Sequence, residues 1–189
     1  TGMTTFVRPD GSVNHIVEFD PFEGGVVRTY GGQGYEEGSS WTRGQTWALY
    51  GYMMSYIHTQ KDEYLQTAKR IANYFIANIP ADGVIPIDFR QPKEPKREDD
   101  TAAAIAACGL IEIAKVVGVH EKDLYLGAAL KLLQTLDSSR INWTTESDSL
   151  VQYGSGSYHT ASHHHPIIYG DYYFMEAIFK LKGNDLYLW

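Results

Sequence analysis

Two kinds of helical pattern alternate along most of this chain. Residues 45–58 and 102–117 are apolar almost all the way round, which is typical of helices buried on every side. Residues 63–79 and 122–137 instead carry one apolar stripe, which predicts amphipathic helices with one face in water. Residues 171–182 begin aromatic and end basic, as a helix C-terminus prefers. This order predicts an all-α fold of about five helices that alternate between an inner and an outer layer, as in an α/α toroid.

The connections between these helices are uneven in length. Those that lead from an expected outer helix to the next inner one, residues 80–99 and 138–170, are long, and such lengths are uncommon without a function. In a toroid they lie together on one face. A stack of helical repeats would also fit the order, although no fixed-period repeat is visible. We predict one domain over residues 1–189, with its functional loops at one end.

The segment before the helices predicts an N-terminal β-hairpin. Residues 5–7 and 13–19 are rich in strand formers, and residues 9–12 (PDGS) between them are the residue types of a tight turn. The glycine-rich residues 24–38 follow, and they show no helical period. We expect this stretch to be an irregular loop.

Composition and charge narrow the range of partners. The 189 residues are 43% hydrophobic, which suffices for an ordinary core. The formal net charge is −7 and the basic residues are scattered, which argues against nucleic acid or an anionic membrane surface as a partner. No apolar run approaches the roughly 20 residues of a membrane-spanning helix. The single cysteine, Cys108, lies in an apolar stretch and suits a reducing compartment.

The densest group of candidate binding residues surrounds the start of the first apolar helix. Trp41 and Trp47 provide flat apolar plates that suit the C–H faces of a sugar ring. Arg43 carries a planar fork of donors that matches a carboxylate, and Gln33 offers both a donor and an acceptor for hydroxyls. The same residues also fit a structural role, in which both tryptophans are core and Arg43 pairs with a buried carboxylate.

Other polar groups are weaker candidates. Asp99 and Asp100 precede one apolar helix and Asp171 opens another; a glycosidase needs two such carboxylates. Aspartates at helix N-termini usually serve as caps, and we expect that role here. The histidines at 163–165 are adjacent in a loop, so they do not easily converge on one ion. We therefore expect no metal and no cofactor.

Eight motifs follow one another in a fixed order. They are RPDGSVNH at 8–15, FDP at 19–21, GGQG at 31–34, SSWTRGQTWALYG at 39–51, DGVIPIDF at 82–89, TAAAIAACGLIEIA at 101–114, GSYH at 156–159 and GDYYFMEA at 170–177. As an ordered set they resemble the unsaturated glucuronyl hydrolases of glycoside hydrolase family 88, and the resemblance spans the whole chain. No single motif would be specific enough alone.

The resemblance implies a concrete fold and chemistry. Members are (α/α)6 barrels that remove a terminal 4,5-unsaturated uronic acid from lyase-generated oligosaccharides. They hydrate the vinyl-ether double bond: an aspartate protonates C4 and helps water add at C5. The implied partners are oligosaccharides of chondroitin or hyaluronan type. His15, Gln33, Trp41, Arg43 and Trp47 fall on the positions that line the uronate subsite.

Two departures from the family pattern affect the expected subsite. Many members have a histidine where this chain has Gly32. In some relatives the loop after GSYH uses serines and a lysine to receive sulfated sugars. Here Ser157, with Thr160 and Ser162, stands for the serines, and the histidines at 163–165 stand near the lysine position. Ser157 is therefore a further candidate binding residue, and a preference for sulfated sugars does not carry over.

The family's two central aspartates precede the RPDGS motif, so we assign no catalytic residue to this chain. Residues 1–4 (TGMT) carry neither an initiator methionine nor a signal-peptide pattern. We expect the C-terminal portion of an (α/α)6 barrel, inactive alone, whose partner is the N-terminal half of the barrel. A half barrel exposes inner helices, so we also expect association or poor solubility.

Two alternatives stay open. One is an unsaturated rhamnogalacturonyl hydrolase, which shares the barrel and the hydration chemistry, although WTRGQTW and its spacing from Gln33 favour the glucuronyl type. The other is a non-catalytic carbohydrate-binding or structural helical module. The family is bacterial, and we expect a cytoplasmic or a periplasmic location, with the cytoplasm favoured.

Overall fold

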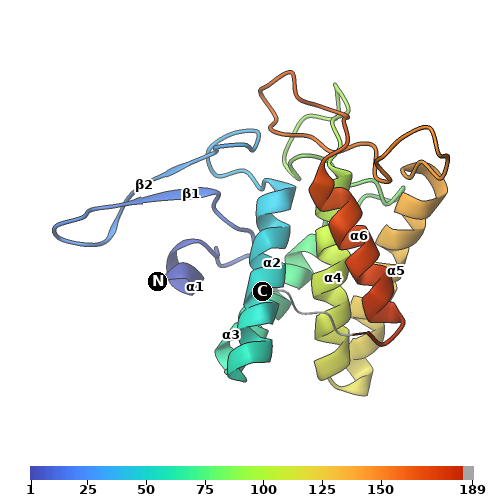
Figure 1. The fold of residues 1–189 in the computed structure, drawn as a ribbon. Coiled ribbons are helices and arrows are strands. Elements are labelled where there is room, and N and C mark those ends of the chain that lie inside the picture. The colour runs from blue at the N-terminus through green and yellow to red at the C-terminus, as the bar shows by residue number, and fades with distance from the viewer. Residues whose placement is uncertain (185–189) are drawn as a thin grey trace.

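Helix α4 (Asp100–Val116) is the centre of the fold in a computed structural model, which describes residues 1–184 (Figure 1). Every residue of α4 from Asp100 to Ala114 is buried. Its alanines let neighbouring helices approach closely. At Gly109 a side-chain Cβ would lie 2.8 Å from Cγ of Leu49, so only glycine fits there without a shift of its neighbour. The other elements are α1 (Gly2–Thr5), β1 (Ile16–Phe19), β2 (Val26–Tyr30), α2 (Thr42–Thr59), α3 (Asp62–Ala77), α5 (Val119–Ser139) and α6 (Ile168–Leu181).

The helices form the two layers that the sequence predicts. α2 and α6 pack on either side of α4, α3 packs on α2, and α5 packs on α4. α2, α4 and α6 begin at the same end of the molecule, where the long loops also lie (Figure 1). The five predicted helices are confirmed, each within three residues of its expected start and two of its expected end.

The three apolar helices differ in how completely they are covered. α4 is buried all round, as predicted. α2 and α6 are not, because Gly51 of α2 and Ile168, Tyr169 and Phe179 of α6 are exposed. The expectation that residues 45–58 are buried on every side is therefore wrong for one face of α2.

The β-hairpin exists, but its strands are not the predicted pair. β1 pairs antiparallel with β2, with Ile16 opposite Tyr30, and the two strands project away from the helices (Figure 1). Only an isolated bridge joins Val7 to Val13 across the predicted turn. The glycine-rich stretch supplies β2, and Gly24 and Gly25 adopt positive φ angles of 74° and 87° before it. A strand bounded by glycines gave no periodic signal long enough to detect.

Isolated bridges and hydrogen bonds cross-link the long loops at the end where the inner helices begin. Pro86 pairs with Glu98 in the first loop, and Ile141 pairs with Val151 in the second. The two loops also meet each other, because Ser155 Oγ donates to the Glu98 carbonyl at 2.6 Å, so they lie on one face as predicted. Across residues 1–184, none of the helices combines the length and apolar character needed to cross a membrane.

Candidate functional site

The start of α2 is fixed against the first long loop. Trp41 forms an antiparallel bridge with Asp88. The backbone N–H of Thr42 donates to the Ile87 carbonyl at 2.9 Å, and its hydroxyl donates to the Pro86 carbonyl at 2.7 Å. These bonds satisfy donors that a helix N-terminus otherwise leaves free. They hold the first turn of α2, with Trp41 and Arg43, at the loop end of the molecule.

Asp88 is the residue that organises this loop end. Its side chain is fully buried and accepts hydrogen bonds from Tyr35 N (3.0 Å), Ser39 Oγ (2.6 Å), Ser40 N (3.0 Å) and Arg90 N (2.9 Å). A buried carboxylate is stable only when its oxygens are satisfied in this way. Sequence reasoning missed this role. The available signal was an aspartate directly after the apolar run of DGVIPIDF.

Three of the predicted binding residues lie in direct contact. The ring of His15 stacks on Trp41 at a centroid distance of 4.3 Å and an angle of 23°. His15 Nε2 and Gln33 Oε1 are 3.2 Å apart, and Gln33 Nε2 donates to the Gly156 carbonyl at 2.6 Å. Tyr158 N donates to the Gln33 carbonyl at 2.9 Å. We call His15, Gln33, Trp41 and Gly156 the mouth cluster.

Two polar atoms of the mouth cluster remain unsatisfied. Within residues 1–184, Trp41 Nε1 and His15 Nδ1 are buried and have no hydrogen-bond partner. Native proteins rarely leave such atoms unpaired, so each is a candidate contact for a ligand hydroxyl or for water. The hollow beside them, which Asn14, Glu36 and Ser39 also line, is closed and has no room for a sugar ring.

Gly32 departs from the family pattern, and its surroundings give a reason. It has a φ angle of +56°, and a Cβ at this position would lie 2.9 Å from His15 Nδ1. A larger residue at position 32 would therefore displace the His15 ring as it lies here. His15 occupies the space above Gly32.

Arg43 is buried and bound to protein groups. It is 4% exposed, and Nη1 lies 3.3 Å from the carboxylate of Asp99. Nη1 also donates to Thr101 Oγ1 at 3.2 Å. Nη2 donates to the carbonyls of Ser155 (2.8 Å) and Gly156 (2.9 Å). The guanidinium carbon lies 5.1 Å above the ring of Trp41.

These contacts engage the same donors that a bidentate grip on a sugar carboxylate would use. Both terminal nitrogens already face protein acceptors, as in the alternative in which Arg43 pairs with a buried carboxylate. Burial raises the pKa of Asp99, and the positive charge of Arg43 opposes that rise. Arg43 therefore joins the start of α4 to residues 155–156, and through Gly156 it supports Gln33.

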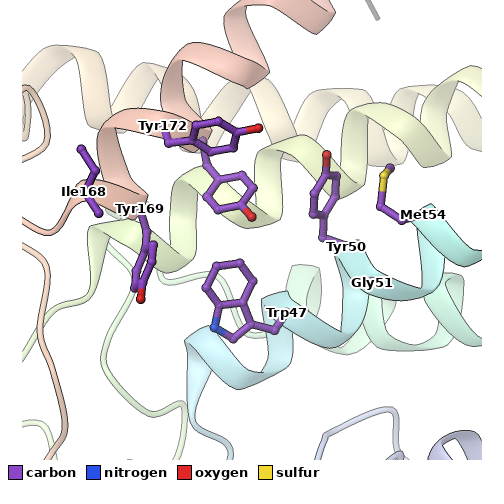
Figure 2. Close-up of a pocket in the computed structure, with 8 residues that line it drawn as sticks. Trp47, Tyr50, Gly51, Met54, Ile168, Tyr169 and Tyr172 are labelled. Carbon is purple, nitrogen blue, oxygen red and sulfur yellow. The ribbon is translucent and has the colours of Figure 1, made fainter. Parts of the chain in front are cut away.

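Trp47 lies about one turn further along α2 than Arg43 and faces a different surface. Its ring makes edge contacts with Tyr169 (5.7 Å) and Tyr173 (5.4 Å) of α6. It also packs against the aromatic group that contains Trp41 and Tyr158. Trp47 lines an apolar groove of about 590 Å³ between α2 and α6, with Tyr50 and Met54 further down α2 (Figure 2). Trp47 thus links the mouth cluster to this groove.

Ser157 lies in the loop that carries the histidines. Its carbonyl accepts a hydrogen bond from His163 Nε2 at 2.9 Å, while His159 Nε2 donates to the Tyr35 carbonyl at 2.6 Å. Arg97 lies over the ring of Tyr158 at 4.4 Å and holds the same loop. Within residues 1–184, no three His, Cys, Asp or Glu side chains converge closely enough to hold a metal ion. His159 and His163 are positioned by backbone carbonyls, and His165 Nε2 lies 3.3 Å from Ser162 Oγ.

The expected capping roles of the three aspartates are not what the structure gives. Asp99 stands at the N-cap of α4 but makes no side-chain capping bond. Asp171 accepts the backbone N–H groups of Leu150 (3.1 Å) and Val151 (2.8 Å), so it ties the second long loop to α6. Asp99 instead faces Arg43 of α2, and Asp171 binds the backbone of the second long loop.

Asp100 is a second buried acid of the site whose pKa is raised. It is 1% exposed, its nearest cation is Arg140 at 3.9 Å, and Oδ2 has no hydrogen-bond partner within residues 1–184. Burial raises the pKa of Asp100 to about 8, and the neighbouring Glu98 and Asp99 add to the rise. Asp100 is enclosed beside Arg140 and Tyr153 rather than open to a ligand.

No family model matches the chain. Curated relatives do. The unsaturated glucuronyl hydrolase of Bacillus sp. (strain GL1) is 37% identical in an alignment of length 190 that covers 97% of this chain and 50% of the relative. The unsaturated chondroitin disaccharide hydrolase of Streptococcus pyogenes serotype M1 is 33% identical in an alignment of length 180 that covers 92% of this chain and 45% of the relative. The chain spans about half the length of the curated relatives it matches.

Solved structures agree. The crystal structure of unsaturated glucuronyl hydrolase from Bacillus sp. GL1, described as responsible for the degradation of glycosaminoglycan, matches with a TM-score of 0.90 and 35% identity. The match covers 96% of this chain and 49% of that one. A mutant of the enzyme from Streptococcus agalactiae, complexed with dGlcA-GalNAc6S, matches with a TM-score of 0.81 and 31% identity, over 93% of this chain and 48% of that one. The fold is therefore that of part of an α/α toroid.

Proposed function

Since this chain is a homologue of the unsaturated glucuronyl hydrolases along nearly all of its length, we propose that it forms the substrate-binding wall of such an enzyme. The substrate is an oligosaccharide of chondroitin or hyaluronan type that ends in a 4,5-unsaturated uronic acid. The complementary half, equivalent to the part of the relatives that this chain does not match, supplies the catalytic aspartates. The relatives' names favour this activity over that of a rhamnogalacturonyl hydrolase.

The observation that carries the proposal is the mouth cluster. His15, Gln33, Trp41 and Gly156 come from four separate segments and meet at the loop end. Their unsatisfied Trp41 Nε1–H and His15 Nδ1 are positioned to meet hydroxyls or the ring oxygen of a sugar. A purely structural module gains nothing from burying two unpaired polar atoms.

We assign the residues roles in binding only. Trp41 and Trp47 confine the sugar ring, Gln33 and His15 bind its polar groups, and Ser157 lies near the next sugar. Arg43 acts as a support that holds residues 155–156, and its charge contributes to attracting the uronate. The remaining walls of the cavity belong to the complementary half.

In the reaction, a proton is added to C4 and water to C5 of the double bond, and the resulting hemiketal opens and releases the partner sugar. No carboxylate of this chain is assigned to that step. Asp99 faces Arg43, Asp100 lies enclosed beside Arg140, and Asp171 binds the backbone of a loop. Proton transfer needs a group within hydrogen-bond reach of the substrate.

The test is turnover of unsaturated chondroitin disaccharide, followed as loss of the ultraviolet absorbance of its double bond. The 189-residue chain alone is expected to be inactive. The chain joined to the complementary half is expected to hydrolyse this disaccharide. It is expected to hydrolyse an unsaturated rhamnogalacturonan disaccharide more slowly. Absence of turnover by the joined protein contradicts the proposal. Turnover by the chain alone would assign the acid to Asp99, Asp100 or Asp171.

A further inference from the structure

The ring of His15 is held by contacts with three neighbours. It stacks on Trp41 at a centroid distance of 4.3 Å, and its Nε2 lies 3.2 Å from Gln33 Oε1. Gly32 lies against the same ring, because a Cβ built there would be 2.9 Å from His15 Nδ1 and 3.0 Å from Cγ. Its φ angle of +56° is in the left-handed region that favours glycine. A side chain at position 32 would therefore displace the imidazole from Trp41 and Gln33.

The side-chain amide of Gln33 has one favourable orientation. Its Nε2 donates to the Gly156 carbonyl at 2.6 Å. The opposite orientation would bring Oε1 to that distance from the carbonyl oxygen, and two acceptors would then face each other without a proton between them. Arg43 Nη2 donates to the same carbonyl at 2.9 Å and keeps it in place. The Oε1 atom of Gln33 therefore faces His15.

This orientation determines which nitrogen of His15 carries the proton. Because Gln33 Oε1 can only accept, His15 Nε2 must donate. A neutral imidazole has one ring proton, so Nδ1 is then a bare acceptor. In the part of the chain that the structure describes, Nδ1 is buried without a hydrogen-bond partner, and so is Trp41 Nε1, which can only donate. The mouth cluster thus presents one acceptor and one donor of fixed polarity.

The fixed polarity decides which group of a sugar suits His15. A carboxylate or a sulfate offers only acceptors, so it would place a lone pair against the lone pair of Nδ1. A hydroxyl can donate to Nδ1, and its oxygen keeps lone pairs for other donors. A ligand that gives Nδ1 no donor retains the cost of a buried, unpaired acceptor. The imidazole therefore discriminates between hydroxyls and acidic groups.

We propose that Gly32 and Gln33 are positioning residues that fix His15 as the tautomer protonated at Nε2, so that Nδ1 accepts a hydrogen bond from a sugar hydroxyl. The acidic group of the uronate is bound elsewhere. This rests on the proposed function, because it takes a sugar as the ligand. Gly32 acts by leaving room for the ring, and Gln33 acts by offering an acceptor to Nε2.

The first experiment measures the tautomer of His15 in the 189-residue chain by long-range 1H–15N NMR. It is done at about pH 8.5, above the range in which histidines ordinarily titrate. The natural chain should show a protonated Nε2 and an unprotonated Nδ1. Gln33→Met should admit the second tautomer, so that the two 15N shifts move toward each other. Gln33→Glu, which still offers an acceptor, should restore the natural shifts.

Gln91→Met is the matched control for Gln33→Met. The amide of Gln91 also bridges two backbone groups, since it accepts from Asp88 N at 3.1 Å and donates to the Arg97 carbonyl at 3.0 Å. This variant should leave the His15 shifts unchanged. A mixture of tautomers in the natural chain, or equal changes with Gln33→Met and Gln91→Met, would overturn the proposal.

The second experiment compares Gly32→Ala with Gly24→Ala. Gly24 has a φ angle of +74°, so alanine is strained there as well, but an added Cβ meets nothing within 4 Å. Gly32→Ala should remove the ring-current shift that Trp41 imposes on the protons of His15, whereas Gly24→Ala should not. In the joined protein, Gly32→Ala should also weaken binding of unsaturated chondroitin disaccharide at least tenfold. Equal effects of the two variants would show that Gly32 contributes only to backbone stability.

The third experiment tests the ligand group. The chain is joined to a complementary half whose catalytic aspartates are replaced by asparagine, and unsaturated chondroitin disaccharide is added. The Nδ1 resonance of His15 should move as it does for an acceptor that gains a hydrogen bond, while Nδ1 stays unprotonated. Protonation of Nδ1 on binding would overturn the proposal, because His15 would then pair with an acidic group as a cation.

These readouts separate the inference from the proposed function. A single tautomer of His15 that depends on Gln33, without binding or turnover of the disaccharide by the joined proteins, supports the positioning roles and contradicts the proposed function. Turnover by the joined protein with a mixture of His15 tautomers supports the proposed function and overturns the inference.

Discussion

The N-terminal end of α2 and the middle of α2 are stabilised in different ways. At its start, the loop end is cross-linked by buried polar groups, with Asp88 accepting four hydrogen bonds and Arg43 joined to Asp99 and two carbonyls. About two and a half turns later, the groove around Gly51 has an apolar lining and open space. The difference shows which part of the site this chain completes by itself. The loop end is organised by its own hydrogen bonds, whereas the groove has a lining of apolar side chains.

The largest effect should come from breaking the Arg43 network. Arg43→Ala leaves the buried carboxylate of Asp99 and the carbonyls of Ser155 and Gly156 without their partner. The expected loss is about 3–5 kcal/mol of unfolding free energy, the range for a buried ion pair that loses one member. Urea denaturation measures it. Arg28→Ala, which removes an exposed pair with Glu37, is the control and should cost less than about 1 kcal/mol.

If Arg43→Ala costs no more unfolding free energy than Arg28→Ala but abolishes sugar binding, Arg43 is a ligand-binding residue and not a structural support. That result would support the bidentate contact with a sugar carboxylate that the sequence predicts. Loss of both would leave the comparison of the two regions intact, because the loop end would still depend on Arg43.

Asp88→Ala should have the next largest effect, a loss of about 3 kcal/mol of unfolding free energy, because several buried donors lose their acceptor at once. The physical reason is that Tyr35, Ser39 and Ser40 lose one shared acceptor. Asp82→Ala, in the same loop and about half exposed beside Lys96, is the matched control. A change of less than about 1 kcal/mol for Asp88→Ala in urea denaturation would show that the loop end is not organised from within.

Asp100 gives the loop end a pH dependence that the groove lacks. Its folded pKa of about 8 lies above the unfolded value of about 3.9. Between these two pKa values Asp100 is protonated in the folded state and ionised in the unfolded state. The stability that this proton gives the folded state is therefore complete below about pH 4 and is lost as the pH rises through about 8. Asp100→Asn should flatten this slope and gain about 1–3 kcal/mol over the natural chain at pH 9. Parallel pH–stability curves for the two proteins would contradict this.

The sequence predicts those parts of the molecule whose signal is local. The stripe of Tyr64, Ala68, Ile71 and Phe75 predicts α3 by spacing alone, and the unbroken apolar run predicts α4. The grouping of His15 and Trp41 in one expected subsite also came from local motifs, but through a family resemblance and not from spacing. The resemblance identified the residues without their partners.

What escaped prediction depends on distant segments. Nothing near Arg43 indicates that Asp99 and the Ser155 carbonyl meet it, and the aspartate that ends the apolar run of DGVIPIDF does not say that its partners are Tyr35 and Ser40. β2 escaped for a different reason, since its five residues follow two glycines and carry too short a pattern. Hydrogen bonds between distant segments decide the first kind of feature, and pairing with β1 decides the second.

The most direct test of the account compares turnover of unsaturated chondroitin disaccharide by the 189-residue chain and by the same chain joined to the complementary half. The account predicts loss of the double-bond absorbance with the joined protein, and none with the chain alone at equal concentration. Equal rates in the two samples would contradict it, because the acid would then belong to this chain. No turnover in either sample would contradict the assigned activity itself.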